Sequence, residues 1–309
     1  MKKLLFLLVV AALLIPLTAT AADKIVIGLA LPSLSHPFFV FLQQNVMDEA
    51  KKLGVEVIAI DAQDVAAKQM SIVEDFIAKK VNGVLMSPIG QDALVPAVEA
   101  LNAAKIPVAT VDRKVAGGDV LVHVGADNVE GGRVAGRFIV EKLGGKGNVL
   151  ELEGTPGASP AIDRKKGFDE VIAKSQIKIL VSQTAEFGRA KGQSVMENLM
   201  QSNKDFQGVF GANDEMILGA IEAMQAAKVD LSKVVTIGYD AIPDALTYIK
   251  DGKLGATIEQ FPGEQARKAL RFLVEAIKDK KQPPSKEVYI TPLAIDAKSL
   301  DKAEHKVEK

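Results

Sequence analysis

Apolar and polar positions alternate between two kinds of segment along this chain. Short runs rich in β-branched residues, such as KIVIGLAL and VEVIAI, are separated by longer stretches in which apolar residues recur every three or four positions. The short runs predict strands, and the longer stretches predict helices near residues 38–53, 65–80 and 92–104. The other predicted strands of this half are GVLMS, PVATVD and VLVHVGAD.

The same pattern repeats in the second half of the chain, after Gly147. The strand-like runs there are NVLELEG, IKILVSQ, GVFGAN, VVTIGYD and LGATIEQ, with helical stretches between them. Strands that alternate with helices of about 10 to 15 residues form right-handed βαβ units and parallel sheets. The sequence therefore predicts an α/β protein with two parallel sheets of similar size.

Residues suited to helix ends occur where these periods place them. Pro37 suits the first turn of a helix, and Gly54 suits the position just past a helix end. Asn213 or Asp214 suits the N-cap of the helix that EMILGAIEAMQAA predicts. The local signals thus agree with the periodicity.

The N-terminal stretch MKKLLFLLVVAALLIPLTATAAD begins with basic residues, continues with an apolar run and contains the small-residue pattern Ala19-Thr20-Ala21. This combination predicts an export signal over residues 1–21. An uncleaved membrane anchor is the alternative, but Pro16 interrupts the apolar run and the cleavage pattern follows directly. The rest of the 309-residue chain is long enough for two domains.

Composition narrows the compartment and the class of partner. The chain has no Cys, so we expect neither disulfides nor a lipid-anchored cysteine, and the periplasm of a Gram-negative cell fits best. The net charge is −1, with both signs spread along the chain, which argues against nucleic acid or an anionic membrane as partner. His36, His123 and His305 show no metal-ligand spacing, and we expect no metal and no cofactor.

Hydrogen-bonding, charged and aromatic residues follow the predicted strands. In open parallel sheets, ligands bind at the carboxyl ends of the strands. Carboxylates paired with guanidinium or amide groups satisfy hydroxyls, which both donate and accept, and a Phe face stacks on the C–H face of a sugar. Two Asp and two Arg also cancel in charge, which limits the cost of burial. The candidates are Asp112, Arg113, Arg164, Phe187, Asn213, Asp240 and Gln260.

Several motifs make a resemblance specific: HPFF, TVDR, GADNVEGGRVAG, ELEGTPGASPAIDRKKGF, AEFGRAKG, NDEMILGA, GYDAIPDA and GKLGATIEQ. On these motifs the chain resembles the periplasmic sugar-binding proteins of the ribose-binding group, the substrate-binding components of ABC importers. The resemblance covers essentially the whole chain after the export signal. It implies the type I periplasmic binding protein fold, in which two doubly wound lobes are joined by three crossover hinge segments and clamp a sugar.

The resemblance also implies a division of the chain. Residues 22–126 and 261–289 would form the N-terminal lobe, and residues 127–260 and 290–309 the C-terminal lobe. The hinges would lie near residues 125–128, 260–263 and 289–292. Closure of the lobes on a ligand would then present one combined surface to an importer permease, and a chemoreceptor is a further candidate partner. We expect a monomer.

The motifs assign ligand contacts residue by residue. The first lobe would contribute His36, Phe38, Phe39, Asp112 and Arg113, and the second Arg164, Phe187, Asn213, Asp240 and Gln260, the last at a crossover. Ribose binders typically have Asn where this chain has His36, whose larger ring offers different hydrogen bonds. The resemblance implies ribose or a close relative as the ligand, and the departure at His36 leaves another sugar, a polyol or a sugar-like signal as the alternative.

Each assigned residue also has a purely structural interpretation. Phe39 begins a helical core stripe, since Leu42 and Val46 follow at helical spacing. Asn213 suits a helix cap, and Arg164 stands in the charged run DRKK, which is typical of a solvated helix face. Asp112, Phe187 and Asp240 suit loops at strand ends, and His36 suits a local cap.

Two other functional classes compete with a transport receptor. The effector core of a sugar-responsive repressor shares the two-lobed architecture, but the chain has an export signal in place of a DNA-binding headpiece. An enzyme would need a catalytic signature, yet no G-x-S-x-G elbow, P-loop or G-x-G-x-x-G after a strand is present. Asp112 and Asp240 remain conceivable as a hydrolase pair. We expect no catalytic residue, and turnover of glycosides would distinguish an enzyme from a receptor.

Overall fold

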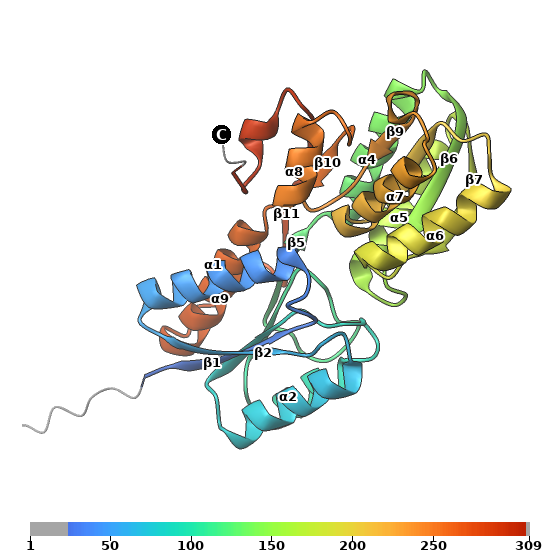
Figure 1. Cartoon of the computed structure of the whole chain (residues 1–309). Helices are drawn as coiled ribbons and strands as arrows, with labels where there is room; N and C mark the ends of the chain where they lie inside the picture. The colour runs from blue at the N-terminus through green and yellow to red at the C-terminus, as the bar shows by residue number, and fades with distance from the viewer. Residues whose placement is uncertain (1–23, 307–309) are drawn as a thin grey trace, which may run out of the picture.

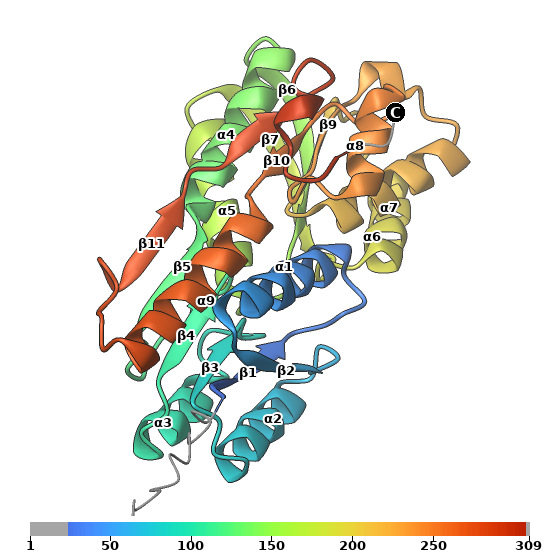
Figure 2. The ribbon, with the colours of Figure 1, turned by 90° about the vertical axis from the view of Figure 1, so that its left-hand side faces the viewer.

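The computed structural model describes residues 24–306, so the predicted export signal at residues 1–21 lies outside the described residues. The chain forms two lobes, each a parallel sheet with helices on both faces (Figures 1 and 2). Among the described residues, no helix is long and apolar enough to cross a membrane. The predicted fold class, α/β with two doubly wound parallel-sheet lobes, is confirmed.

The first lobe is built on a six-stranded sheet with the strand order β11-β5-β4-β3-β1-β2, and all its pairings are parallel. Its inner strands β3, β4 and β5 are buried along their whole length because helices cover both faces of the sheet. The strands are β1 (Val26–Leu31), β2 (Glu56–Asp61), β3 (Gly83–Met86), β4 (Val108–Val111), β5 (Val122–Ala126) and β11 (Glu287–Ile290).

Four helices cover this sheet. Helices α1 (Pro37–Leu53) and α9 (Pro262–Lys278) pack together on one face, and α2 (Ala66–Ala78) and α3 (Val95–Ala103) pack on the other (Figure 2). As predicted, Pro37 lies in the first turn of α1, and Gly54 closes the helix in the left-handed region at φ 67°.

The second lobe is built on a four-stranded parallel sheet in the order β7-β6-β8-β9. The helix pairs α4/α5 and α6/α7 pack tightly, and Figure 2 shows them on opposite sides of the sheet. The strands are β6 (Lys146–Glu153), β7 (Gln176–Thr184), β8 (Gly208–Gly211) and β9 (Val235–Ile237). The helices are α4 (Asn128–Lys142), α5 (Ser159–Ile172), α6 (Arg189–Ser202), α7 (Asp214–Ala226), α8 (Pro243–Lys250) and the short 3₁₀ turns η1 (Leu231–Lys233) and η2 (Leu300–Lys302).

One predicted strand has a different partner from the one expected. The stretch LGATIEQ forms β10 (Thr257–Glu259), which pairs antiparallel with β12 (Leu293–Ile295) in a separate two-stranded sheet. The prediction of two sheets of similar size is wrong in this respect. The parallel contact of β10 with β9 is limited to an isolated bridge between Ile237 and Ala256 and to backbone bonds such as Asp240 N–H to Ile258 O (2.7 Å).

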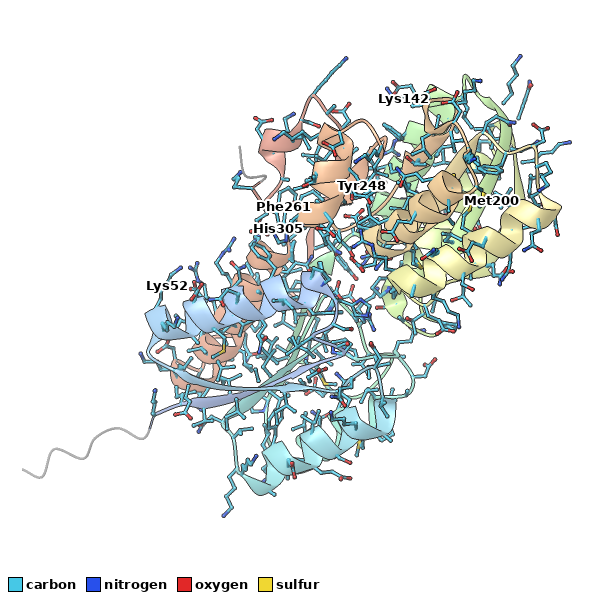
Figure 3. All side chains as sticks on the ribbon, viewed as in Figure 1. Lys52, Lys142, Met200, Tyr248, Phe261 and His305 are labelled. Atoms are coloured by element: carbon cyan, nitrogen blue, oxygen red, sulfur yellow. The ribbon has the colours of Figure 1, made fainter. Side chains whose placement is uncertain are left out.

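The chain passes between the two lobes three times: between β5 and α4, between β10 and α9, and between β11 and β12. These passages fall in the three predicted hinge segments. Phe261, labelled in Figure 3, lies at the second passage with a left-handed φ of 56°. The lobe limits at residues 126, 260 and 289 stay a prediction.

Helices α4 and α5 approach each other through glycines on both sides. A Cβ atom at Gly167 would lie 1.9 Å from the carbonyl oxygen of Val129, and one at Gly132 would lie 2.1 Å from that of Arg164. Because both obstacles are backbone atoms in helices, a side chain cannot move aside to relieve the clash. The residue type at these positions therefore sets the spacing of the two helices.

We expect Gly167→Ala to lower the free energy of unfolding by about 1 to 3 kcal/mol, the usual cost of overpacking. The matched control is Gly90→Ala, because a Cβ atom there meets its nearest neighbour at an ordinary 3.5 Å. Thermal and urea unfolding of both variants measure the difference. Equal stability of the two variants would show that α4 and α5 separate without cost.

Candidate functional site

One cavity between the two lobes is lined by all ten residues that the sequence singled out. The space between these side chains, including the part open to solvent, is about 320 Å³. Nine of the ten are buried to 6 % exposure or less, which places them in the interior of the closed cleft. The lining residues are His36, Phe38, Phe39, Asp112, Arg113, Pro160, Arg164, Phe187, Asn213, Asp240 and Gln260. Their contact with a ligand stays a prediction.

The fold explains why residues so distant in sequence meet. Asp112 follows β4, Asn213 follows β8 and Gln260 follows β10. The carboxyl ends of parallel strands meet at one edge of a sheet, and the two lobes turn these edges toward each other. Asp112 adopts a left-handed φ of 63° and Asp240 one of 113°, so both carboxylates leave the strand direction where the strands end.

Asp112 and Arg113 form the charged pair of the first lobe. Arg113 Nε lies 3.8 Å from Asp112 Oδ2, and Arg113 Nη1 donates to the carbonyl oxygen of Ile89 (3.2 Å). The hydroxyl of Ser87 donates to Asp112 Oδ2 (3.4 Å). Burial raises the pKa of the Asp112 carboxyl against the opposing charges of Arg113 and Arg164. A bound hydroxyl that donates to this carboxylate would offset part of its lost hydration.

Arg164 and Asp240 form the charged pair of the second lobe. Arg164 donates through Nε to Asn128 Oδ1 (2.8 Å) and through Nη1 to the carbonyl oxygen of Ala212 (2.8 Å). Its Nη1 also lies 3.5 Å from Asp240 Oδ1, which accepts a hydrogen bond from Gln260 Nε2 (2.6 Å). Burial raises the pKa of Asp240 to about 7 in spite of the nearby guanidinium. The solvated-helix interpretation of Arg164 is therefore wrong, since its side chain is 3 % exposed.

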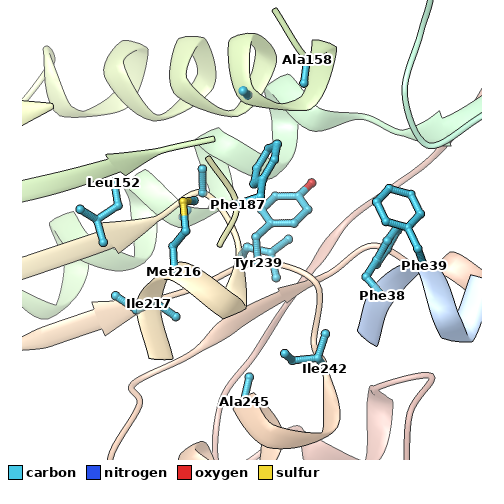
Figure 4. Close-up of a cluster of buried hydrophobic side chains, with 14 of the residues drawn as sticks. Phe38, Phe39, Leu152, Ala158, Phe187, Met216, Ile217, Tyr239, Ile242 and Ala245 are labelled. Atoms are coloured by element: carbon cyan, nitrogen blue, oxygen red, sulfur yellow. The ribbon is translucent and has the colours of Figure 1, made fainter. Parts of the chain in front are cut away.

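Aromatic rings form the apolar walls of the cavity. Figure 4 shows Phe38 and Phe39 opposite Phe187, and these three rings line the cavity, whereas the fully buried Tyr239 next to Phe187 does not. The guanidinium carbon of Arg113 lies 5.2 Å from the ring centroid of Phe39 and 5.4 Å from that of Phe187, so it joins walls from both lobes. Both rings of the Phe-Phe pair are buried, and they meet edge to face at 5.1 Å. Core packing and cavity lining thus coexist at Phe39.

Asn213 combines the two roles that its sequence position suggested. Its Oδ1 accepts from the backbone N–H of Met216 (3.0 Å), which makes it the N-cap of α7 as predicted. Its Nδ2 donates to the carbonyl oxygen of Phe187 (3.1 Å). The second Nδ2 hydrogen remains for a ligand, because a primary amide carries two donors.

Three contributors to the site were missed by sequence reasoning. Pro160 lines the cavity from the first turn of α5, and Asn128 holds the Arg164 guanidinium. Tyr239 lies beneath the same guanidinium, whose carbon is 3.6 Å from the ring centroid. The sequence GYD shows that Tyr239 precedes Asp240. No feature of the sequence indicates that the Tyr239 ring is buried beneath an arginine side chain.

The two lobes touch directly beside the cavity. Gln91 N–H donates to the carbonyl oxygen of Gly157 (2.9 Å), and Lys114 N–H donates to Ser159 Oγ (2.8 Å). Lys114 Nζ lies 3.6 Å from Asp163 Oδ2. The structure is thus a closed form in which first-lobe and second-lobe loops meet.

The electrostatics of the cavity suit a neutral, hydroxylated ligand. Two carboxylates face two guanidinium groups, so their charges cancel, and the aromatic walls are uncharged. Within residues 24–306, no group of three or more His, Cys, Asp or Glu side chains is placed to hold a metal ion. The site can therefore clamp a polar ring through hydrogen bonds and stacking.

Several known proteins are similar to this chain in sequence and in architecture. The ribose import binding protein RbsB of Salmonella typhimurium is 41% identical over 282 residues, covering 91% of this chain and 94% of that protein. The solved Caulobacter myo-inositol binding protein bound to myo-inositol superposes with a TM-score of 0.87 at 37% identity, covering 91% of this chain and 96% of that one. An ABC transporter periplasmic solute binding protein from Actinobacillus succinogenes with bound D-allose has a TM-score of 0.83 at 32% identity, covering 89% and 99%.

The family profile described as "Periplasmic binding protein domain" matches residues 27–281, which include all ten predicted site residues. The match spans both lobes and most of the described chain. The chain belongs to the periplasmic binding protein family.

Proposed function

We propose that the protein captures a monosaccharide or a cyclic polyol between its lobes and delivers it to an ABC-type importer. The observation that carries this proposal is the convergence of two Asp–Arg pairs and aromatic walls from both lobes on one buried cavity. Each sugar hydroxyl both donates and accepts, so a set of carboxylates, guanidinium groups and amides can satisfy several hydroxyls at once.

Each wall has a distinct task in this proposal. Phe39 and Phe187 stack on the C–H faces of the ring, Asp112 and Asp240 accept from hydroxyls, and Asn213 donates. Only the closed form contacts the ligand from both sides, so the ligand shifts the equilibrium toward closure. The ligand leaves chemically unchanged.

The proposed setting is the periplasm, reached through the N-terminal export signal, with no lipid anchor and no cofactor. The proposed partner of the closed form is the membrane-embedded permease of an importer, and a chemoreceptor is a second candidate. We propose a monomer, because closure of the two lobes completes the cavity within one chain.

Ribose is the first candidate ligand, because relatives that are 41% and 46% identical over 91% and 76% of this chain are named ribose import binding proteins. His36 favours a second candidate class, since it lines the cavity where ribose binders typically have Asn. Solved relatives are bound to myo-inositol and to D-allose, which are six-membered rings with more hydroxyls than ribose. A hydrolase that uses Asp112 and Asp240 is the remaining alternative of another class.

A ligand screen tests the proposal. Purified protein would be heated with pentoses, hexoses and cyclic polyols, and each ligand that raises the melting temperature would be titrated by calorimetry. We expect tight binding of one or a few neutral rings and recovery of each unchanged by mass spectrometry. Absence of binding to every neutral ring would refute the proposal, and turnover of glycosides would replace it with the hydrolase.

Replacing Phe187 with alanine should weaken sugar binding at least about five-fold, since aromatic stacking contributes on the order of 1 kcal/mol beyond burial. Phe187 packs face-on against Gly154, where a Cβ atom would lie 2.1 Å from the ring. The control is Phe138→Ala, which removes a half-buried ring from α4 outside the cavity. Calorimetry that gives equal affinities for both variants would remove Phe187 from the site.

A further inference from the structure

His36 faces a carboxylate at the edge of the cavity. It occupies the N-cap position of α1, but its side chain makes no capping hydrogen bond. Instead its Nε2 lies 3.5 Å from Oδ2 of Asp64, and its ring meets Phe39 edge to face at 6.4 Å. The interpretation of His36 as a side-chain cap is therefore wrong. The imidazole lies between a cavity wall and a carboxylate from another loop.

The loop that carries Asp64 is held in an unusual backbone conformation. Gln63 and Asp64, between β2 and α2, both adopt left-handed φ angles, 54° and 56°. Such angles cost energy for residues other than glycine, so neighbouring contacts must maintain them. Asp64 N–H donates to the carbonyl oxygen of Pro32 (2.7 Å), and Asp61 Oδ1 accepts from the backbone N–H of Gln63 (2.8 Å) and of Leu34 (3.3 Å). These bonds fasten the Asp64 loop to the loop that leads into His36.

The charges around Asp64 favour its ionised form. Burial opposes ionisation, but the neighbouring His36 imidazole, the polar Ser33 side chain and the positive charge of Arg113 hold the pKa of Asp64 below its ordinary value. The carboxylate side chain is half exposed, so it stays hydrated on one side while it faces the imidazole on the other. Asp64 therefore offers His36 a charged acceptor.

We propose that Asp64 is a positioning residue that fixes the orientation of the His36 ring, and that the pair selects among polyhydroxylated rings by their hydroxyl next to the start of α1. This inference rests on the proposed function. A neutral imidazole that donates through Nε2 to a carboxylate keeps Nδ1 as an acceptor. Carboxylates orient metal-binding histidines in the same way. A ligand hydroxyl would then meet a fixed acceptor, where the Asn of ribose binders offers a movable amide with both donor and acceptor.

Asp64 and His36 also interact with charged side chains that belong to both lobes. The positive charge of Arg113 lowers the pKa of Asp64, and the negative charge of Asp64 opposes the effect of burial on the pKa of Arg113. In the second lobe, burial raises the pKa of Glu215, and the charges of Arg189 and His36 oppose this shift. The His36 imidazole thus has a carboxylate from each lobe in its surroundings. Removing Asp64 would leave the ring free to rotate and would change which hydroxyl pattern it accepts.

A double-mutant cycle tests the proposal. Asp64→Gly removes the side chain at a φ angle that glycine adopts freely, His36→Ala removes the ring, and the third protein carries both changes. Calorimetry with ribose, D-allose and myo-inositol would give affinities for each protein. For the ligand that the parent prefers, we expect each single variant to lose about three-fold or more, and the double variant to lose no more than the worse single one.

Two further proteins separate positioning from folding. Asp64→Asn keeps an acceptor oxygen and tolerates the left-handed φ, so we expect it to recover part of the affinity. The matched control is Gln63→Gly, because Gln63 has nearly the same φ and an exposed side chain in the same loop. It should leave affinity and ligand ranking unchanged.

The outcomes divide cleanly between the two proposals. Non-additive losses with a changed ligand ranking support the Asp64–His36 pair. Additive losses, an unchanged ranking in both single variants, or equal effects of Gln63→Gly and Asp64→Gly overturn the pair while sugar binding by the parent stands. A parent protein that binds no neutral ring overturns the proposed function and the pair together.

Discussion

Replacing Arg164 with alanine is expected to lower sugar affinity by a factor of about thirty or more. The substitution removes hydrogen bonds to Asn128 and to the carbonyl of Ala212, and it removes the guanidinium that lies over Tyr239. It also leaves Asp240 buried without its cationic neighbour. Truncating one member of a buried charge pair costs about 2 to 5 kcal/mol of binding free energy, much of it because the other member loses its partner.

The control for this experiment is Arg133→Ala on α4. Arg133 is about one-third exposed and pairs with Glu130 and Glu170 on the outside of the same lobe. Surface ion pairs contribute about 0 to 1 kcal/mol, so this variant should bind like the parent. Arg164→Lys should fall between the two, because a lysine keeps the charge but cannot form the same fork of hydrogen bonds. If calorimetry places Arg164→Ala within three-fold of the control, the charged pair does not contact the sugar.

The arrangement of the site could be predicted because it follows from chain topology. Asp112, Asn213 and Gln260 were found as residues that end strands, and parallel strands bring their carboxyl ends together. The rule needs only the strand assignments, which hydrophobic periodicity supplies. For this reason the seven candidates that follow strands line one cavity, whereas His36, Phe38 and Phe39 in the same cavity were assigned from the HPFF motif and the resemblance that it carries.

Other parts of the site depend on backbone conformations and tertiary contacts that no local sequence pattern predicts. Asp64 reaches His36 through two successive left-handed residues, and neither position carries the Gly or Asn that signals such a turn. Tyr239 reads as the end of a strand, and nothing local shows that an arginine from α5 lies over its ring. The antiparallel partner of β10 lies more than 30 residues further along the chain, so no local pattern predicts that pairing.

Asp240 makes a second prediction possible, in which stability and binding change in opposite directions. Burial raises its pKa to about 7, whereas the ordinary pKa of an Asp carboxyl, as in an unfolded chain, is 3.8. Between these two pH values the ligand-free folded protein retains a proton that the unfolded chain has lost. Stability from this group is therefore complete below about pH 4 and declines as the pH rises through 7. Burial also raises the pKa of Glu259 to about 7, so the parent's pH profile contains more than one carboxyl.

Comparison with a variant isolates the contribution of Asp240. Asp240→Asn cannot ionise, so above pH 7 the ligand-free variant avoids the cost of a buried carboxylate. We expect its melting temperature at pH 8 to exceed that of the parent by at least about 2 °C, which corresponds to roughly 1 kcal/mol in a chain of this size. Toward pH 4 and below the difference should nearly vanish, because the folded and the unfolded parent then both hold the proton.

Sugar binding should respond in the opposite direction. The Asp240 carboxylate accepts hydrogen bonds from hydroxyls through two oxygens, and asparagine replaces one of them with a donor. We expect Asp240→Asn to bind sugar at least about ten-fold more weakly at pH 8, which means that the carboxylate is retained for binding at a cost to the ligand-free fold. The control is Asp244→Asn, since Asp244 is exposed on α8 and pairs with Arg189 outside the cavity. An Asp240→Asn variant that is less stable than the parent at pH 8 would mean that the attraction between Asp240 and Arg164 outweighs the burial of the carboxylate.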